Sequence, residues 1–357
     1  MPIEIHVLGT SSARPAQGRS VSGSLVETED GIFVVDCGEG FQNRLVEHRS
    51  RLKKAESKKL KVSKIAAILL THGHLDHTWG VLPWLQTMAL DGRNEPLWII
   101  GPTSEQVIDV LLGEEGEPEV SPSDLVIQYD MWMDLGAVSE ELGYDLLWIL
   151  GDGKRWVDMN TGKQIELPQP LKKSSIAAIN TQHTVPSFAW KISTKSRKGK
   201  FDRKSAKELP QGVVMKLASG EDVEHEGVTL KSSDYRGPNF QPVSVVISGD
   251  TAEQAIETTC DLLIHEATFL KEHQDIANEH LHSTAAGAAR TAVECNAKHL
   301  ALTHYSARLE NGVMSLEEAR DIHESVFALS DGDRLVLGDD CSLTHLIKSE
   351  GEWIVNI

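Results

Sequence analysis

The chain has 357 residues, of which 40% are hydrophobic, and this is enough to bury a large core in one large domain or two fused halves. No apolar run approaches the roughly 18 residues of a membrane-spanning helix, and Met1–Thr10 lacks the features of a signal peptide. The net charge of −18 argues against a uniformly basic nucleic-acid-binding surface, and four scattered cysteines without a CxxC pair indicate a reducing, cytoplasmic setting.

The first part of the chain predicts three strands and one helix. A turn at Glu29-Asp30-Gly31 joins the second strand to the third. The strands are expected at Ile3–Leu8, Ser24–Glu27 and Ile32–Asp36, and the helix at Phe41–Arg51. Asp36 therefore stands at a strand end, where a carboxylate either orients a metal-bound histidine or caps the following helix.

Three histidines and an aspartate then fall within six residues of the segment Thr71–His77. The preceding run Ile65–Leu70 predicts a buried strand, and the following run Trp79–Leu90 predicts a helix. A strand-to-helix turn lets side chains converge, and imidazole with carboxylate suits zinc, manganese or iron. A histidine-rich surface loop is the alternative. The candidate ligands here are His72, His74, Asp76 and His77.

After residue 90 the sequence predicts strands and helices clearly in some stretches and not in others. Strands are expected at Leu97–Ile100, Ile176–Ile179, Ser187–Ile192, Val243–Ser248, Leu262–Ile264, Leu300–Leu302, Arg334–Val336 and Leu343–Ile347. Helices are expected at Ser104–Leu112, Ala252–Thr259, His280–Cys295 with its start near Ser283, and Leu316–Phe327. The pattern between Gly113 and Leu171 is too weak to place elements, and the charged stretch Ser193–Pro242 favours an excursion from the core.

Two basic islands interrupt this acidic chain. Arg49–Lys64 carries eight Lys or Arg residues against one Glu, and Lys191–Lys207 carries eight against one Asp. Such islands are either solvated faces or local contacts for a nucleic acid.

A histidine or an aspartate recurs at the ends of the predicted strands. In sheets flanked by helices, the carboxyl edge of the strands is where ligands bind, so these residues are expected to meet. The residues in such positions are Asp36, His72, His183, Asp250, His265 and His304.

Seven nitrogen and oxygen ligands are more than one tetrahedral zinc ion with an open position accepts, and they suit two metals that share a carboxylate. His72 and His74 would reach one ion, and Asp76 and His77 would turn toward the other. Asp250 is the best candidate for the shared carboxylate, because it comes from a different strand. The remaining two candidates are His183 and His304.

Eight segments together resemble the metallo-β-lactamase superfamily, whose signature is HxHxDH followed by distant His, Asp and His ligands, and within it the ribonuclease Z family. The resemblance covers residues 1–105, 176–202 and 243–310 and is poor over 106–175, 208–242 and the C-terminal tail. The matching segments are Gly9–Pro15, Asp36–Gly40, Thr71–His77, Gln182–Phe188, Ser248–Thr251, His265–Phe269, His282–Thr284 and Thr303–Arg308.

The resemblance implies an α/β fold of one domain, a four-layer αββα sandwich over residues 1–357 with halves at about 1–175 and 176–357. It also implies a protruding basic arm over about 193–242, whose lysines dock phosphates. Members of this family usually form homodimers in which the arm of one subunit serves the precursor tRNA at the other.

The activity that the resemblance implies is that of a short-form, zinc-dependent endoribonuclease that removes the 3′ trailer of tRNA precursors. A hydroxide held between two zinc ions, or manganese ions in their place, would attack the phosphodiester. One zinc would be held by His72, His74 and His183, the other by Asp76, His77 and His304, with Asp250 shared. Substrate contacts are expected at Arg19, Lys198, Lys200, Arg203 and Arg308.

The same resemblance assigns roles in proton transfer. Asp76 would also orient or deprotonate the attacking water, His282 would protonate the leaving 3′ oxygen, and Glu266 would orient His282. Phosphodiester cleavage needs such a leaving-group acid independently of the family, and a histidine held by a carboxylate supplies it. The alternative for Glu266 is a structural salt bridge, and His265 itself fits a structural role.

The chain departs from the family pattern at three places. The usual HLHGDH is HGHLDH here, because Gly73 and Leu75 are exchanged. The loop Pro15–Ser20, which resembles PxKxRN, has Gln17 and Ser20 in place of Lys and Asn. The Gly/Pro-rich stretch of the arm is reduced to a single Pro-Gln-Gly, whereas the basic stem Lys195–Lys207 is retained.

Two other functions are compatible with these features. One is a hydrolase of the same fold that acts on a small phosphodiester or sulfate ester, which the altered loop and the acidic surface favour. The other is a non-catalytic nucleic-acid-binding scaffold, which the complete ligand set disfavours.

Overall fold

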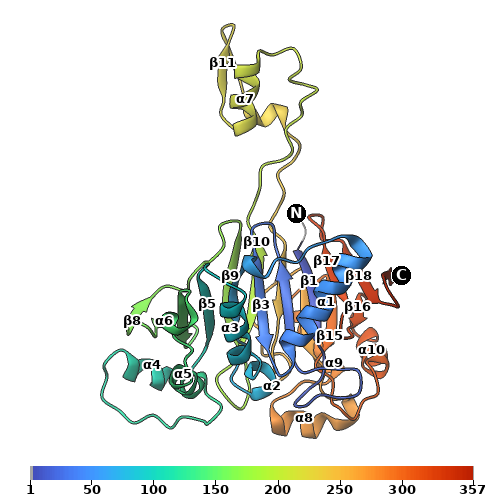
Figure 1. The fold of residues 1–357 in the computed structure, drawn as a ribbon. Coiled ribbons are helices and arrows are strands. Elements are labelled where there is room, and N and C mark those ends of the chain that lie inside the picture. Colours follow the sequence, from blue (N-terminus) through green and yellow to red (C-terminus); the bar gives the residue numbers. More distant parts are fainter. Residues whose placement is uncertain (1–2, 357) are drawn as a thin grey trace.

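Two β-sheets form the middle of the molecule in this computed structural model, which describes residues 3–356 (Figure 1). In spatial order, the 11-stranded sheet consists of β19 (Trp353–Val355), β18 (Leu343–Lys348), β17 (Arg334–Leu337), β1 (Ile3–Gly9), β2 (Gly23–Glu27), β3 (Ile32–Cys37), β4 (Ile65–Leu69), β5 (Leu97–Pro102), β6 (Leu146–Gly151), β7 (Trp156–Asp158) and β8 (Lys163–Ile165). The 6-stranded sheet consists of β16 (Val326–Ala328), β15 (His299–Thr303), β14 (Leu262–Glu266), β13 (Ser244–Ile247), β10 (Phe188–Thr194) and β9 (Ser174–Asn180).

Four consecutive strands run parallel in each sheet, β3 to β6 in the first and β13 to β16 in the second. Parallel strands end at a common edge, so the segments that follow them come together there. Both edges lie at the end of the sandwich that carries the short helix α2 (Leu75–Thr78) (Figure 1).

Helices cover the outer face of each sheet. On the first sheet these are α1 (Phe41–Glu56), α3 (Val81–Leu90), α4 (Glu105–Leu111), α5 (Leu125–Asp134) and α6 (Ser139–Leu142), and on the second they are α9 (Ala285–Glu294) and α10 (Val313–Arg320). Helix α8 (Gln274–His280) lies at the end of the sandwich that carries α2. The 3₁₀ turns of the sandwich are η1 (Val62–Lys64) and η3 (Lys271–His273). None of the helices within residues 3–356 combines the length and the apolar character that a membrane span requires.

Three separate apolar layers show how the sandwich is built. The first layer packs α1, α3 and α5 onto the large sheet, through side chains such as Leu45, Trp84 and Trp132. The second lies between the two sheets, and the third packs the alanine-rich α9 and α10 onto the small sheet. Helix, sheet, sheet and helix therefore follow one another, and the expected four-layer αββα sandwich is confirmed.

An arm of residues 195–243 leaves the sandwich between β10 and β13, at the end opposite α2 (Figure 1). It contains α7 (Gln211–Ser219), the hairpin β11 (Val223–His225) and β12 (Val228–Leu230), and the turn η2 (Ser232–Tyr235). A small interior holds it together: Leu217 is fully buried, Phe201 stacks on Tyr235, and Arg236 donates to the carbonyl of Gly199.

Two helices expected from the sequence are wrong in whole or in part. Ala252–Thr259 is not helical, because Gln254 has a left-handed φ of 59° and its N–H donates to Thr291 Oγ1 on α9 instead of to a helical carbonyl. The helix expected at Leu316–Phe327 is α10, which ends at Arg320, since Phe327 pairs with Ala301 as part of β16.

The stretch Gly113–Leu171, which the sequence left unplaced, forms α5, α6 and the strands β6 to β8. The buried strand β6 extends the first sheet in parallel with β5, and α5 covers it through Trp132 and Trp148, whose ring centroids are 5.5 Å apart. This region therefore belongs to the sandwich.

We expect Trp190→Ala to lower the free energy of unfolding by about 3–5 kcal/mol, because it empties the space between the sheets. Trp190 is fully buried there, and its Nε1 donates to the carbonyl of Leu70, two residues before His72. Urea unfolding measures the effect, and the half-exposed Trp79→Ala is the control. Equal stability of the two variants would contradict this account of the core.

Candidate metal centre and active site

Asp36 is the buried support of the histidine cluster. Its carboxylate accepts hydrogen bonds from the N–H of Thr71 at 2.9 Å and from Thr71 Oγ1, and it lies 2.7 Å from His77 Nδ1. Helix α1 has no side-chain cap at its start. Of the two roles open from the sequence, the geometry therefore favours orientation of a histidine over capping of a helix.

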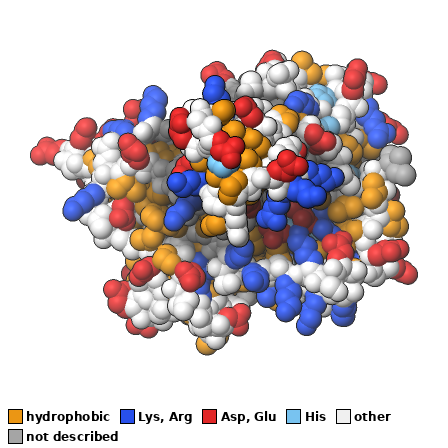
Figure 2. Space-filling model, turned by 90° about the horizontal axis from the view of Figure 1, so that it is seen from above, with side chains coloured by type: hydrophobic (Ala, Val, Ile, Leu, Met, Phe, Trp, Pro, Cys, Tyr) orange, Lys and Arg blue, Asp and Glu red, His pale blue; other side chains and the backbone are white. Residues whose placement is uncertain are grey.

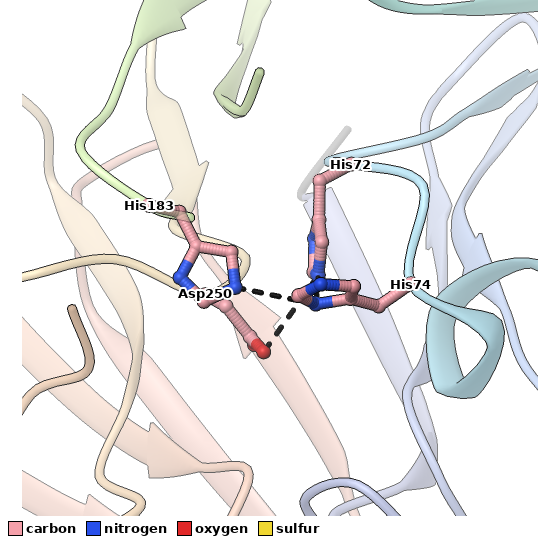
Figure 3. A group of neighbouring side chains, drawn as sticks. All are labelled: His72, His74, His183 and Asp250. Atoms are coloured by element: carbon pink, nitrogen blue, oxygen red, sulfur yellow. Dashed lines mark hydrogen bonds and ion pairs between the residues drawn. The ribbon is translucent and has the colours of Figure 1, made fainter. Parts of the chain in front are cut away.

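Four side chains from three segments converge in a first cluster (Figure 3). His72 Nε2 lies 3.0 Å from His74 Nδ1, which lies 3.3 Å from His183 Nε2, and Asp250 Oδ2 is 3.8 Å from His72 Nε2. His72 and His74 follow β4, His183 lies in the turn between β9 and β10, and Asp250 follows β13. All four ligand atoms lie within 4.8 Å of one another.

A second cluster shares Asp250 with the first. Asp250 Oδ1 lies 3.2 Å from both His77 Nε2 and His304 Nε2. Asp76 Oδ2 completes this cluster at 3.5 Å from the same two nitrogens. One carboxylate therefore presents one oxygen to each cluster, which is the arrangement that a bridging ligand of two metal ions requires.

The nitrogens that face away from the clusters are held by the protein. His77 Nδ1 faces Asp36, His183 Nδ1 lies 3.1 Å from the carbonyl of Leu281, and His304 Nδ1 lies 3.1 Å from Thr268 Oγ1. Such partners fix the ring orientation and place the proton on the outer nitrogen, so that the inner nitrogen keeps its lone pair.

The donor set fits divalent cations. Burial, reinforced by the neighbouring histidines, lowers the pKa of His74 to about 4 and that of His72 well below its usual value, so both rings are neutral. Asp250 Oδ1 is buried, and within residues 3–356 it has no hydrogen-bond donor other than the two imidazole nitrogens that face it at 3.2 Å. Burial opposes charge on His77, but Asp250, Asp36 and Asp76 raise its pKa well above the usual value, and a metal ion would displace that proton.

His282 and Glu266 form a pair beside the two clusters. His282 Nδ1 lies 2.8 Å from Glu266 Oε1 and 4.0 Å from Asp250 Oδ2. Glu266 is fully buried and also accepts from the N–H groups of Thr251 and Thr268. Burial alone would lower the pKa of His282, but Glu266 and Asp250 outweigh it and raise the pKa to about 9, so the imidazole is protonated at neutral pH.

The position of His282 follows from the local sequence His-Ser-Thr. Thr284 caps α9 by accepting from the N–H of Gly287 at 3.0 Å, which fixes the chain just before the helix. The N–H of His282 donates to the carbonyl of Ala277, in the last turn of α8. The imidazole is thereby aimed at Asp250 and His304.

The exchanged residues Gly73 and Leu75 have different surroundings. A Cβ on Gly73 would lie 1.8 Å from the carbonyl oxygen of Ser123, and Gln128 on α5 donates to the Gly73 carbonyl. Leu75, by contrast, is 52% exposed. Close packing of α5 against the metal-binding turn therefore requires glycine at 73 and leaves room for a large residue at 75.

The expected substrate contacts lie in different surroundings. Arg19 is only 9% exposed and donates to the carbonyls of Ser306 and Leu309, so in this structure it anchors the loop after His304 instead of facing solvent. Arg308 is exposed on that loop, and the arm residues Lys198, Lys200 and Arg203 are exposed far from the clusters. Direct contact of these five residues with a substrate stays a prediction.

His265 does not join the site, since its ring is fully buried and its Nδ1 lies 2.7 Å from the carbonyl of Glu266. Sequence reasoning missed Thr268, which supports Glu266 and His304 together, and Gln128, which holds the turn after His72. Thr268 lies within the family-like segment His265–Phe269, so the sequence motif could have indicated it. Gln128 lies in the stretch Gly113–Leu171, where no sequence pattern pointed to a functional residue.

Known proteins share the fold of this chain. Residues 16–118 match the family model described as the metallo-beta-lactamase superfamily. Among solved structures, the fold resembles the metallo-beta-lactamase fold protein YhfI from Bacillus subtilis (TM-score 0.58, 18% identity, 94% of this chain and 100% of that one). It also resembles human tRNase Z, short form (TM-score 0.54, 21% identity, 93% of this chain and 98% of that one).

Curated relatives cover nearly the whole chain. Ribonuclease Z of Ignicoccus hospitalis is 32% identical over 336 residues, which is 93% of this chain and 97% of the relative. Ribonuclease Z of Methanosarcina mazei is 30% identical over 337 residues, which is 92% of this chain and 96% of the relative. The chain belongs to the ribonuclease Z family of the metallo-β-lactamase superfamily.

Substitution of Gly73 is expected to remove metal, whereas substitution of Leu75 is not. Gly73→Ala forces the turn between His72 and His74 away from Ser123, so the variant should bind less than half of the wild-type metal after dialysis. Leu75→Ala is the matched control and should keep the wild-type content. Metal analysis with circular dichroism checks both, and full metal content in Gly73→Ala would refute the packing argument.

Proposed function

We propose that this protein is a metal-dependent endoribonuclease that hydrolyses a phosphodiester of tRNA precursors and releases their 3′ trailer. The observation that carries the proposal is the position of the His282–Glu266 pair beside two ligand clusters joined by Asp250. Membership of the ribonuclease Z family supplies the class of substrate. The exposed arm supplies a place for a large RNA to bind.

The ligand set assigns a role to each side chain. One cation, proposed to be Zn²⁺ with Mn²⁺ as a substitute, would be held by His72, His74 and His183, a second one by Asp76, His77 and His304, and both by Asp250. Two such cations neutralise charge on a phosphate and lower the pKa of water between them. Asp36 and Thr71 hold the histidines from behind, so the geometry is set before the substrate arrives.

The attacking water and the leaving oxygen are proposed to interact with different side chains, Asp76 and His282. Asp76 keeps a lowered pKa despite burial, because His77 and His304 favour its charged form, so it would orient the attacking water as a hydrogen-bond acceptor. His282 is protonated and donates to the leaving 3′ oxygen. Glu266 holds its Nδ1 at 2.8 Å, which leaves Nε2 as the donor.

The arm is proposed to bind the RNA away from the cut. Its stem, Lys195–Lys207, carries seven Lys or Arg residues and one Asp, whereas the head over residues 208–234 carries six Asp or Glu residues and two Lys. Phosphates are therefore expected on the stem, including Lys198, Lys200 and Arg203, and not on the tip. Arg308 would act near the cut, on the exposed loop after His304.

A homodimer is the proposed assembly. The arm points away from the metal-binding end of its own subunit (Figure 1). Apolar side chains next to α2 and on α5 are exposed, and they line a hollow of about 360 Å³ that a second copy would cover. These exposed apolar residues are Trp79, Met131 and Leu135. The four unpaired cysteines favour a cytoplasmic location.

A second candidate function is hydrolysis of a small phosphodiester or sulfate ester by the same metal centre. The observation that favours it is the buried position of Arg19, which belongs to the altered loop Pro15–Ser20. The discriminating assay incubates the metal-loaded protein with a tRNA precursor that carries a 3′ trailer. Cleavage next to the discriminator base supports the proposal, and no cleavage at low salt favours the small ester.

His282→Ala should lower kcat by about 10²–10⁴, the usual contribution of a general acid, while the metal content stays at the wild-type level. The metal measurement matters because Glu266, His282 and His304 themselves lie close enough to hold an ion. Single-turnover cleavage and elemental analysis give the two readouts. Loss of metal together with activity would make His282 a ligand and not an acid.

Replacement of residues 195–240 by a short Gly-Ser linker should abolish cleavage of precursor tRNA but spare hydrolysis of a chromogenic phosphodiester. The arm has its own interior around Leu217, and Arg197 at its base is paired with Glu29 and Asp339, so we expect the sandwich to stay folded without the arm. Thermal unfolding verifies that point. Unchanged tRNA cleavage, or loss of both activities in a folded variant, would show that the arm has another role.

A further inference from the structure

The first basic island, Arg49–Lys64, has no role in the proposed function. In the structure it forms the C-terminal half of α1, the turn at Ser57, and the loop through η1 that leads into β4. Lys53 and Lys54 lie in the last turn of α1, where a cation also interacts favourably with the helix dipole. That interaction accounts for two lysines of the island at most.

Three cations of the island serve the fold. Lys58 forms ion pairs with Glu4 and Glu27, Arg49 Nε donates to the carbonyl of Leu60 at 3.2 Å, and Arg51 donates to the carbonyl of Ser349 and lies over Trp353. Removal of these side chains would disturb packing as well as charge. They are unsuitable as probes of a surface role.

The other five cations have no acidic partner within ion-pair distance in the described part of the chain. All five are exposed, although the protein has 18 more acidic than basic residues. They are Lys53, Lys54, Lys59, Lys61 and Lys64. Five uncompensated lysines within 12 residues of an acidic protein form a local positive surface, which we call the α1 basic surface.

Two hollows flank the α1 basic surface. Lys53, Lys59 and Lys61 line one of about 750 Å³, together with Arg49, Lys58 and Arg93, against the two carboxylates of Asp91 and Glu95. Lys54 lines another of about 550 Å³, which shares Val46 and Ser50 with the first, with Arg44, Arg51 and Lys348 against Glu47 and Asp331. In both hollows cations outnumber carboxylates. Figure 2 shows Lys and Arg side chains gathered along one side of the molecule when it is viewed from the arm.

We propose that the α1 basic surface is a second contact for the phosphate backbone of the RNA substrate, separate from the arm. Helix α1 begins next to Asp36, behind the metal-binding residues, and ends at this surface. Its 16 residues place the surface about 24 Å from the start of the helix. Hollows of this size admit a nucleotide-sized group. Flexible lysine side chains that are not held in ion pairs can contact successive phosphates of an RNA backbone.

This inference rests on the proposed function for the identity of the RNA. A contact so far from the reacting phosphate affects affinity and its salt dependence, and not the chemical step. Lysine contacts to phosphates carry no base specificity, so the surface is expected to act on all tRNA precursors alike.

The test compares two double variants that remove equal charge. Lys59→Gln with Lys61→Gln changes the α1 basic surface, and Lys163→Gln with Lys172→Gln changes two exposed lysines on another part of the molecule. Binding of a precursor tRNA is measured between 50 and 300 mM salt. We expect the slope of log K against log salt to fall by about 2 for the first pair, with a higher KM and kcat changed less than twofold. The second pair should keep the wild-type slope.

The possible outcomes separate the two proposals. Wild-type slope and KM in the first pair, while wild-type protein cleaves the precursor, would overturn the α1 basic surface and leave the proposed function standing. A reduced slope in a protein that does not cleave would support an RNA contact and reject the proposed function. Binding to phosphatidylserine vesicles that is lost in the first pair, without any change in RNA binding, would identify a membrane-binding surface and overturn the RNA contact.

Discussion

The shared carboxylate of Asp250 is the contact on which the rest of the site depends. It follows β13 of the small sheet, whereas His72, His74 and His77 follow β4 of the large sheet. Its two oxygens face different groups of histidines, at 3.8 Å from His72 and 3.2 Å from His77. The site is therefore complete only when the two sheets pack face to face at the correct distance, and the apolar layer between them sets that distance.

Hydrogen bonds from the small sheet to the histidine turn strengthen this dependence. The N–H of Phe188 donates to the carbonyl of Thr71 at 2.8 Å, and Trp190 Nε1 donates to the carbonyl of Leu70. Both donors belong to β10, which also follows the turn that holds His183.

The basic side chains are unevenly distributed over the surface. An acidic protein that binds RNA needs its positive side chains concentrated in a few places. The arm stem and the α1 basic surface are two such concentrations.

The sequence predicted the superfamily fold well, and it named the residues that the two clusters bring together. This worked because the candidates sit at the ends of short apolar strands, and because parallel strands end at one edge whatever the details of packing. It failed where long-range contacts decide the local structure. The backbone at Gln254 is fixed by Thr291 on α9, and Gly73 is required by Ser123 and Gln128, which lie in a segment without a recognisable pattern. The buried position of Arg19 likewise depends on carbonyls 287 and 290 residues away in the chain.

A crystal structure of the zinc-loaded protein, with anomalous diffraction at the zinc edge, is the direct test of whether Asp250 joins two cation sites into one centre. We expect two peaks about 3.5–4 Å apart, one on each side of the Asp250 carboxylate. One peak should lie near His72, His74 and His183, and the other near Asp76, His77 and His304. A single peak, or two peaks of which neither lies within bonding distance of Asp250, would contradict this expectation.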